Sequence, residues 1–335
     1  MPGAAAALGL AGVPPYRPPW WLRGGHAQTV WASAFRRVVA GAPVRERLEL
    51  PDGDFLDLDW HRVGASRVVI IAHGLEGDSR RGYVRGLARA LNRRAWDVVA
   101  WNLRGCSGEP NRLPRSYHSG ASEDLAAVVS GIAGRGHATV AVCGFSLGGN
   151  LTLKFLGEGR PEGARVVAGV AVSVPCDLRA SALRLDASVN RIYLRRFLDS
   201  LRHRMDAKRR QFGAIIPVVD RAAIRNFLDF DDRFTAPLHG FRDAADYWER
   251  CSALRFLSGI RVPTLVLNAA DDPFLTPECH PRQDAAKNPR LTVEITDHGG
   301  HVGFVGGGRH PGEYWSELRI ASFLEAAVGP STPPF

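Results

Sequence analysis

Continuous apolar runs alternate with amphipathic segments along most of the 335-residue chain. The run RVVIIAHG, which starts at Arg67, lacks regular polar positions, as is typical of a strand buried on both faces. The next segment, GYVRGLARALNRR, repeats its apolar residues every three or four positions, which predicts a helix. Further runs of the first kind start at residues 96, 138, 165, 262 and 291. This alternation predicts an α/β fold with a mostly parallel central sheet and helices on both faces.

Three shorter patterns add elements to this core. VRERLEL and FLDLDWH, joined by the turn PDGD at residues 51–54, both alternate in period two and predict a β-hairpin. SEDLAAVVSGIAG predicts a helix with Ser122 as its N-cap. EYWSELRIASFLEAAV, residues 313–328, predicts a closing helix.

Residues 176–259 contain no buried-strand pattern and are rich in Leu, Ile, Phe and Arg. We expect this segment to form a helical cap over the carboxyl edge of the sheet. The sequence therefore predicts one domain over residues 18–328, with the cap as an insertion. Residues 1–17 are expected to be a disordered or loosely packed lead-in, because they lack the basic start of a signal peptide. A flexible tail is expected over residues 329–335.

Composition is that of an ordinary globular protein, with 45% apolar and 23% charged residues. No apolar run reaches the roughly 18 residues that a membrane-spanning helix needs. The five cysteines are widely spaced and form no C-x-x-C pair, which favours reduced thiols and a cytoplasmic protein.

The net charge of +9 is concentrated in one segment. Residues 179–225 carry twelve Lys or Arg against four Asp. Such a patch predicts peripheral contact with an anionic membrane surface or attraction of an anionic substrate, although a solvated helix face is the alternative. Few aromatic residues are interleaved with these charges, so no nucleic-acid partner is expected.

The pentapeptide GFSLG, Gly144 to Gly148, follows a predicted strand and precedes a predicted helix. In that setting a G-x-S-x-G turn strains the serine and projects its hydroxyl above the sheet. The two outer glycines permit close approach of strand and helix. Ser146 is the predicted nucleophile; the alternative is a glycine-rich turn with a solvent-facing serine.

A nucleophilic serine needs a base that is oriented by a third group, and this type of turn is followed by acid and then histidine along the chain. Asp271 and Asp272 follow the run from residue 262, while His298 and His301 follow the last run. Asp272 is the predicted acid because PFLTP after it is typical of a loop that turns under the histidine. His301 is the predicted base because two glycines before it let its loop approach the serine.

The remaining residues of these loops receive structural roles. Asp271 is expected to stabilise its loop, and the apolar VGF after His301 is expected to wall the pocket. The two histidines would need further convergent ligands to hold a metal, and no such motif is present, so no metal and no cofactor are expected.

Acyl transfer also requires hydrogen-bond donors for the oxyanion. One predicted donor is the backbone N–H of Leu147, which follows the nucleophile. The second is the N–H of Leu75 in the loop HGLEG after the first parallel strand, where glycines allow close approach. His73, at the start of this loop, is expected to be structural.

Six motifs together resemble the YheT-like branch of the α/β-hydrolases, which includes the mammalian ABHD lipid hydrolases with an N-terminal membrane helix. The motifs lie between about Pro18 and Val328 and are WLRGGHAQT, HGLEGDS, NLRGCSGEPNRLPRSYHSG, GFSLGGN, NAADDPF and GGHVGF. The resemblance implies an α/β-hydrolase fold, a triad of Ser146, Asp272 and His301, and hydrolysis of acylglycerols, phospholipids or short acyl esters.

The sequence departs from this family in two places. It lacks the leading membrane helix of the animal members, which puts constitutive anchoring in doubt. Ala27 stands where the family usually has a larger apolar residue. His26, in the same motif, is expected to belong to a structural brace across the sheet.

The leading hypothesis is a serine hydrolase that cleaves carboxylic esters through an acyl-serine intermediate without a cofactor. An acyltransferase could use the same intermediate, with an alcohol or thiol in place of water. The fold also permits a peptidase. From a different class, a non-catalytic lipid-binding scaffold would keep the fold without the chemistry. A nucleic-acid binder would have only the net charge in its favour.

Overall fold

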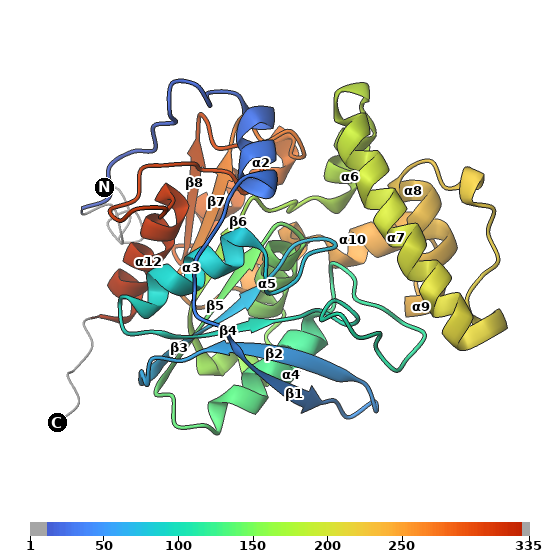
Figure 1. The fold of residues 1–335 in the computed structure, drawn as a ribbon, viewed down its shortest axis with the longest axis horizontal. Helices are drawn as coiled ribbons and strands as arrows, with labels where there is room; N and C mark the ends of the chain where they lie inside the picture. Colours follow the sequence, from blue (N-terminus) through green and yellow to red (C-terminus); the bar gives the residue numbers. More distant parts are fainter. Residues whose placement is uncertain (1–11, 330–335) are drawn as a thin grey trace.

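An eight-stranded sheet forms the centre of the molecule (Figure 1). The computed structural model describes residues 12–329. Strand β2 pairs antiparallel with both β1 and β4, whereas all other neighbouring strands are parallel. The sheet order is β1-β2-β4-β3-β5-β6-β7-β8. The strands are β1 (Val44–Glu49), β2 (Phe55–His61), β3 (Arg67–Ala72), β4 (Asp97–Trp101), β5 (Thr139–Phe145), β6 (Val166–Val172), β7 (Thr264–Ala269) and β8 (Leu291–Thr296).

Helices cover both faces of the sheet because its parallel strands are apolar on both sides. Val68 of β3 packs in one apolar cluster with two helices, and its neighbour Val69 packs in a second cluster with two others. Successive strand residues point to opposite faces, so each run serves two cores. The first face is covered by α4 (Ser122–Ala133) and α5 (Leu147–Gly157), the second by α3 (Gly82–Asn92) and α12 (Trp315–Val328). The predicted α/β fold is confirmed.

The chain between β6 and β7 forms a helical cap beside the sheet (Figure 1). Its longest helix buries Leu194, Leu198, Leu201 and Met205, whose spacing of three and four residues places them on one face. These side chains join an apolar cluster of the cap that also includes Phe274. The cap helices are α6 (Leu178–Asp186), α7 (Arg191–Phe212), α8 (Phe227–Phe230), α9 (Ala236–His239) and α10 (Ala244–Cys251). None of the helices within residues 12–329 is long and apolar enough to cross a bilayer.

The predicted hairpin forms, and the alternation of apolar and polar residues in its second arm is not an alternation of buried and exposed positions. Every residue of β2 is buried, including Asp57 and Asp59. Arginines of β1 cover these carboxylates: Arg47 Nε donates to Asp57 Oδ1 (2.9 Å) and Arg45 Nε to Asp59 Oδ1 (2.7 Å). The alternating acids of β2 are therefore buried in ion pairs, because the arginines of the edge strand β1 cover their carboxylates.

Ser122 is not the N-cap of its helix, so this prediction is wrong. The helix begins at Ser122 itself and Ala121 is the cap. The Ser122 hydroxyl donates instead to Glu158 Oε2 (2.5 Å) and accepts from Lys154 Nζ (3.2 Å). Glu158, which is distant in the sequence, thus binds the Ser122 hydroxyl that the local pattern had predicted to cap the helix backbone.

The N-terminal region contains a helix that the sequence pattern did not predict, α2 (Gly25–Ala34). The chain is also packed from residue 12 onward, since Val13 is buried against α12 and Trp315 Nε1 donates to Pro14 O (2.7 Å). The earlier part of the expected lead-in, residues 1–11, and residues 330–335 of the expected tail lie outside the described residues.

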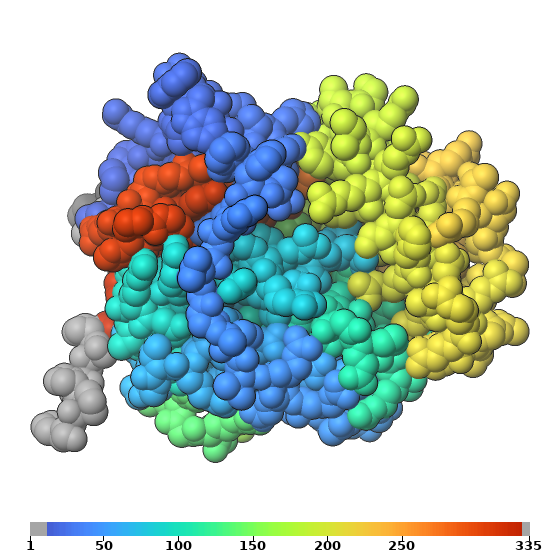
Figure 2. Space-filling model, in the orientation of Figure 1, coloured from blue at the N-terminus to red at the C-terminus, as the bar shows by residue number. Residues whose placement is uncertain are grey.

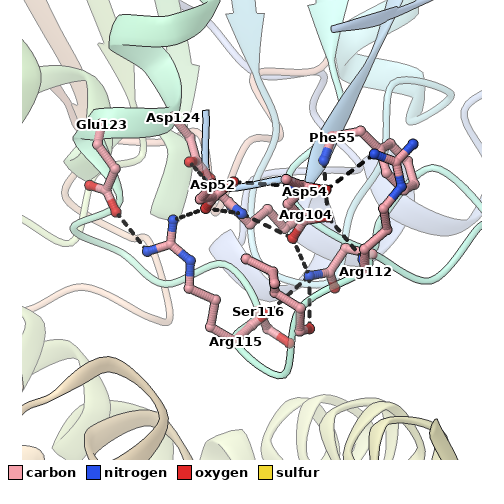
Figure 3. A network of polar contacts seen from close by, with 12 residues as sticks. Asp52, Asp54, Phe55, Arg104, Arg112, Arg115, Ser116, Glu123 and Asp124 are labelled. Atoms are coloured by element: carbon pink, nitrogen blue, oxygen red, sulfur yellow. Dashed lines mark hydrogen bonds and ion pairs between the residues drawn. The ribbon is translucent and has the colours of Figure 1, made fainter. Parts of the chain in front are cut away.

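A buried polar network fixes the loop after β4, and Figure 3 shows its members. Arg104 makes two hydrogen bonds to Asp124 (2.8 and 2.7 Å) and one to Asp54 Oδ2 (2.9 Å). Asp54 also accepts from Asn111 Nδ2 (2.6 Å) and from the backbone N–H of Arg112 (2.9 Å). The guanidinium therefore ties the hairpin, the loop and α4 together without access to water.

We expect Arg104→Met to destabilise the protein by about 3–5 kcal/mol, because it leaves two buried carboxylates without their countercharge. Arg112→Met is the matched control, since the Arg112–Glu49 pair is exposed to solvent and its loss should change stability far less. Urea unfolding followed by tryptophan fluorescence measures both. Equal stability losses in the two variants would contradict the role given to Arg104.

Candidate active site

Ser146 lies in the turn between β5 and α5 with an unusual backbone conformation, φ 53° and ψ −120°. The two glycines of its motif allow strand and helix to approach closely. A Cβ on Gly144 would lie 2.1 Å from Gly148 O, and one on Gly148 would lie 2.5 Å from His73 O. A positive φ at a non-glycine residue costs free energy that the surrounding packing must offset. The turn thus holds the Ser146 side chain above the carboxyl edge of the sheet.

His301 bridges Ser146 and Asp272, which come from different loops. His301 Nε2 is 2.9 Å from Ser146 Oγ, and His301 Nδ1 is 2.8 Å from Asp272 Oδ2. The other Asp272 oxygen accepts from the N–H of Phe274 (2.9 Å), and the Asp272 side chain has no exposed surface. A carboxylate at Nδ1 favours the tautomer with the proton there, which leaves Nε2 free to accept the serine proton.

His298 and Asp271 form a separate pair beside this trio. His298 Nδ1 is 3.3 Å from Asp271 Oδ2, and the other Asp271 oxygen accepts from the N–H of Gly300 (2.8 Å). Burial raises the pKa of Asp271. The His298 side chain is 44% exposed, whereas that of His301 is 11% exposed. The two histidines of the H-x-x-H pair therefore engage different carboxylates, and only His301 reaches Ser146. Within residues 12–329, no cluster of three or more His, Cys, Asp or Glu could hold a metal ion.

Helix α2 supports the loop that carries His301. A Cβ on Gly300, which has φ 57°, would lie 2.3 Å from Gly25 O. The N–H of His301 donates to Thr29 Oγ1 (2.8 Å). The GGHAQT motif, from which only a structural brace was predicted, forms the start of this helix, and its mixed small and polar residues show no amphipathic pattern. The contact with the His301 loop gives the motif its structural purpose.

The VGF segment after His301 does not form a pocket wall as a whole. Val302 lines the larger of the two cavities described below. Phe304 instead is fully buried against Tyr16 and Trp315 on the second face of the sheet. The prediction is wrong for Phe304 because its ring packs into the apolar core of this face and not toward the substrate cavities.

The loop Gly74–Gly77 lies against Ser146, where a Cβ on Gly74 would be 3.1 Å from the serine Cβ. Three of its four amides donate within the protein: Gly74 to Tyr83 Oη (3.0 Å), Glu76 to Tyr117 Oη (2.8 Å) and Gly77 to Gly74 O (3.0 Å). The fourth is that of Leu75. Across residues 12–329 the amides of Leu75 and Leu147, the two predicted oxyanion donors, have no hydrogen-bond acceptor. Both are thus available to a ligand.

His73 precedes this loop and is fully buried. Its Nδ1 donates to Gly74 O (2.8 Å), and its Nε2 accepts from the N–H of Leu103 (3.1 Å). Burial lowers the pKa of His73 to about 4, so the ring is neutral and both nitrogens are engaged. It joins the loop after β3 to the loop after β4.

Two cavities meet at Ser146 and His301. The first, of about 130 Å³, is lined mainly by apolar side chains, many of them from the cap, including Leu201, Phe227 and Phe234. The second is a larger cleft of about 450 Å³ between α2 and α7, and its lining includes the polar side chains of Arg81, Arg196 and Ser200. Figure 2 shows these two helices side by side at the surface, α2 in blue and α7 in yellow-green. A ligand with one apolar and one polar part would find a separate space for each.

Comparison with known proteins shows which family this chain belongs to. A family model described as the alpha/beta hydrolase fold matches residues 67–307, which include Ser146, Asp272 and His301. The chain is 38% identical to YheT of Escherichia coli over 306 residues, which cover 89% of each chain. It is 28% identical over 307 residues to Phospholipase ABHD3 of Bos taurus, a match that covers 87% of this chain and 74% of the relative. The solved esterase Pf2001 of Pyrococcus furiosus shares the fold, with a TM-score of 0.59 and 16% identity over 93% of this chain and 100% of that chain.

One acidic side chain, Asp231, lines the apolar pocket. It accepts hydrogen bonds from Trp248 Nε1 (2.8 Å) and Thr235 Oγ1 (2.6 Å). Burial raises the pKa of Asp231 to about 7, because desolvation outweighs these two donors. The native state therefore keeps a proton on this carboxyl in a pH range where the unfolded chain has released it.

We expect this carboxyl to lower stability as the pH rises from about 4 to about 7, by on the order of 4 kcal/mol in total. Asp231→Asn removes the titration and keeps an acceptor for Trp248, so its stability should fall less over that range than the stability of the wild type. Urea unfolding of both proteins between about pH 4.5 and about pH 8 measures the difference. Parallel curves would show that Asp231 has an ordinary pKa.

Proposed function

Because this chain belongs to the YheT-like branch of the α/β-hydrolase family, we propose that it is a serine hydrolase that cleaves carboxylic esters. Ser146 is the proposed nucleophile, His301 the general base and acid, and Asp272 the carboxylate that orients His301. The observation that carries this proposal is the unbroken hydrogen-bond chain from Asp272 through His301 to Ser146 at the mouth of an apolar pocket.

In the proposed mechanism, Ser146 Oγ attacks the ester carbonyl carbon while His301 Nε2 takes its proton. The amides of Leu75 and Leu147 donate to the resulting oxyanion. When this tetrahedral species collapses, the bond to the alcohol oxygen breaks and His301 protonates that oxygen. A water molecule, deprotonated by His301, then attacks the acyl-serine, and the acid is released with Ser146 restored.

The two cavities divide the proposed substrate between them. The apolar pocket suits the acyl chain, because burying hydrocarbon against apolar side chains removes it from water. The larger cleft also reaches Ser146, and its polar side chains, which include Arg196 and Ser200, suit the alcohol part with a polar head group. Since one relative is named a phospholipase, we propose acylglycerols, phospholipids or related acyl esters as the substrate class.

We also propose that the protein is cytoplasmic and contacts anionic membranes peripherally through the cap side of this cleft. Within residues 12–329, Arg191, Arg195 and Arg196 of α7 are exposed and make no ion pair. Ile192, on the same helix, is 83% exposed, and Trp20, which precedes α2, is 80% exposed. Free arginines beside exposed apolar side chains match a surface of anionic head groups over acyl chains.

Fluorophosphonate labelling tests the nucleophile without knowledge of the natural ester. Ser146→Ala and His301→Ala are expected to abolish labelling, because one removes the attacked atom and the other its base. Asp272→Asn should slow ester hydrolysis by about 10³–10⁴-fold, since the imidazole loses its oriented tautomer. In-gel fluorescence measures labelling, and turnover of p-nitrophenyl esters measures hydrolysis.

The neighbouring pair supplies matched controls for this test. His298→Ala removes an imidazole and Asp271→Asn removes a carboxylate, but this pair does not contact Ser146. Labelling and turnover should therefore stay near the wild-type level. A folded wild type that resists labelling would favour the non-catalytic lipid-binding scaffold. Transfer of the acyl group to an added alcohol or thiol in preference to water would identify an acyltransferase.

Vesicle co-sedimentation tests the membrane contact. Replacing Arg191, Arg195 and Arg196 together with Gln should weaken binding to phosphatidylserine vesicles by about 100-fold, at about 1 kcal/mol per arginine near the surface. The control replaces three exposed basic residues at the opposite, amino-terminal edge of the sheet: Arg93, Lys287 and Arg290. Equal losses in both variants would mean that net charge, and not this face, drives binding.

A further inference from the structure

Glu76, next to the proposed oxyanion donor Leu75, points its carboxylate at the cap. Its backbone has φ 50°, a conformation that side chains other than glycine rarely adopt. Its side chain is 9% exposed. A charged residue with a strained backbone in a four-residue loop at the nucleophile requires specific partners, and the cap supplies two of them.

Helix α7 meets this loop through a polar stripe formed by Ser200, Arg204 and Lys208. These residues recur every four positions and therefore lie on one side of the helix. Arg204 Nε donates to Glu76 Oε1 (2.8 Å), and the Ser200 hydroxyl donates to Glu76 Oε2. Arg204 Nη1 also donates to Gly105 O (2.6 Å) in the loop after β4.

The last member of the stripe extends the same contact. Lys208 is buried, and its ammonium donates to Asn111 Oδ1 and to the carbonyl oxygens of Leu113 and Arg115. Asn111 in turn donates to Asp54, which Arg104 also binds. One side of α7 is thus attached both to the loop beside Ser146 and to the rigid loop after β4.

Tyr117 fixes Glu76 from the side of the sheet domain. Its hydroxyl accepts from the N–H of Glu76 (2.8 Å) and donates to Glu76 Oε1 (2.7 Å). Because one hydroxyl engages both the main chain and the side chain, the carboxylate cannot turn without moving the backbone. Burial pushes the pKa of Glu76 upward, but the Arg204 charge and the hydroxyl donors outweigh it, so the pKa is lowered and the group stays ionised.

We propose that Glu76 is a positioning residue that couples cap helix α7 to the oxyanion site. Arg204 and Ser200 hold the Glu76 carboxylate, Tyr117 transmits that constraint to the Glu76 amide, and the preceding amide of Leu75 is thereby aimed at the oxyanion. The loop is set for catalysis only while α7 is docked. This inference rests on the proposed ester hydrolysis by Ser146 and goes beyond it by making the cap part of the oxyanion site.

Glu76→Gln tests the coupling, because it keeps the shape and the Tyr117 contact but removes the charge that binds Arg204. We expect kcat for a p-nitrophenyl ester to fall by about 10–100-fold, since a small displacement of an oxyanion donor costs that much. KM should change little, because the acyl pocket is intact. Affinity for an alkylboronic acid, whose tetrahedral adduct on serine places an oxygen in the oxyanion site, should weaken by a similar factor.

Arg204 variants separate positioning from general stability. Arg204→Gln should reproduce the kcat loss of Glu76→Gln, and Arg204→Lys should recover part of it because it restores a charge near the carboxylate. Asp206→Asn is the matched control: Asp206 also lies on α7 and pairs with an arginine, Arg221, but at the solvent-exposed surface. Its kcat and boronate affinity should equal those of the wild type.

Each outcome has one meaning. A folded Glu76→Gln with wild-type kcat and boronate affinity overturns the coupling, and so does a change confined to KM. If both charge variants fail to fold, Tyr117→Phe provides the measurement, since it frees the Glu76 amide while leaving the ion pair; wild-type kcat in that variant also overturns the coupling. A wild type that neither labels nor hydrolyses esters would instead overturn the proposed function.

Discussion

The close crossing of β5 and α5 at Ser146 is the constraint on which the rest of the site depends. A Cβ at Gly144 or Gly148 would lie 2.1 or 2.5 Å from a backbone carbonyl oxygen of the facing segment, well inside van der Waals contact. The strained φ of Ser146 persists because the strand before it and the helix after it are both packed into the apolar cores of the sheet. The proposed base, acid and oxyanion donors can act only if they reach the point above the sheet where this crossing places the Ser146 hydroxyl.

Those other groups arrive from the carboxyl ends of several strands and are fixed by polar contacts between loops. His301 follows β8, Asp272 follows β7, and Leu75 follows β3. Thr29 of α2 binds the His301 backbone, and the Ser173 hydroxyl accepts from the N–H of Val302 (2.9 Å). Two hydroxyls and the Asp271 carboxyl therefore hold the backbone of the histidine loop, whereas Asp272 contacts the His301 ring itself. The geometry is maintained by groups that take no part in proton transfer.

The sequence predicted what depends on local pattern and on chain order. Buried runs located the parallel strands, and the serine turn with the later acid and histidine predicted which side chains would meet; their catalytic roles stay predictions. Pattern failed where distant residues decided the outcome. β2 is buried because arginines of β1 cover its acids, Ser122 binds Glu158 instead of capping its helix, and Phe304 turns into the core. The contact between Glu76 and Arg204 joins residues 128 positions apart, and neither carries a local signal.

The basic residues of segment 179–225 have different roles, which their charge alone did not reveal. Along α7, Arg204 and Lys208 are turned inward and hold the cap on the loops around Ser146. Arg202 pairs with Asp199 on the same helix, so its charge is compensated at the surface. Only the remaining group, which includes Arg195 and Arg196, presents free charge to solvent beside the cleft. A single helix thereby combines an apolar side that builds the pocket, a polar stripe that sets the loop, and an outer side suited to an anionic surface. Because these sides share one rigid helix, any partner that moves the outer side also moves the stripe that holds Glu76.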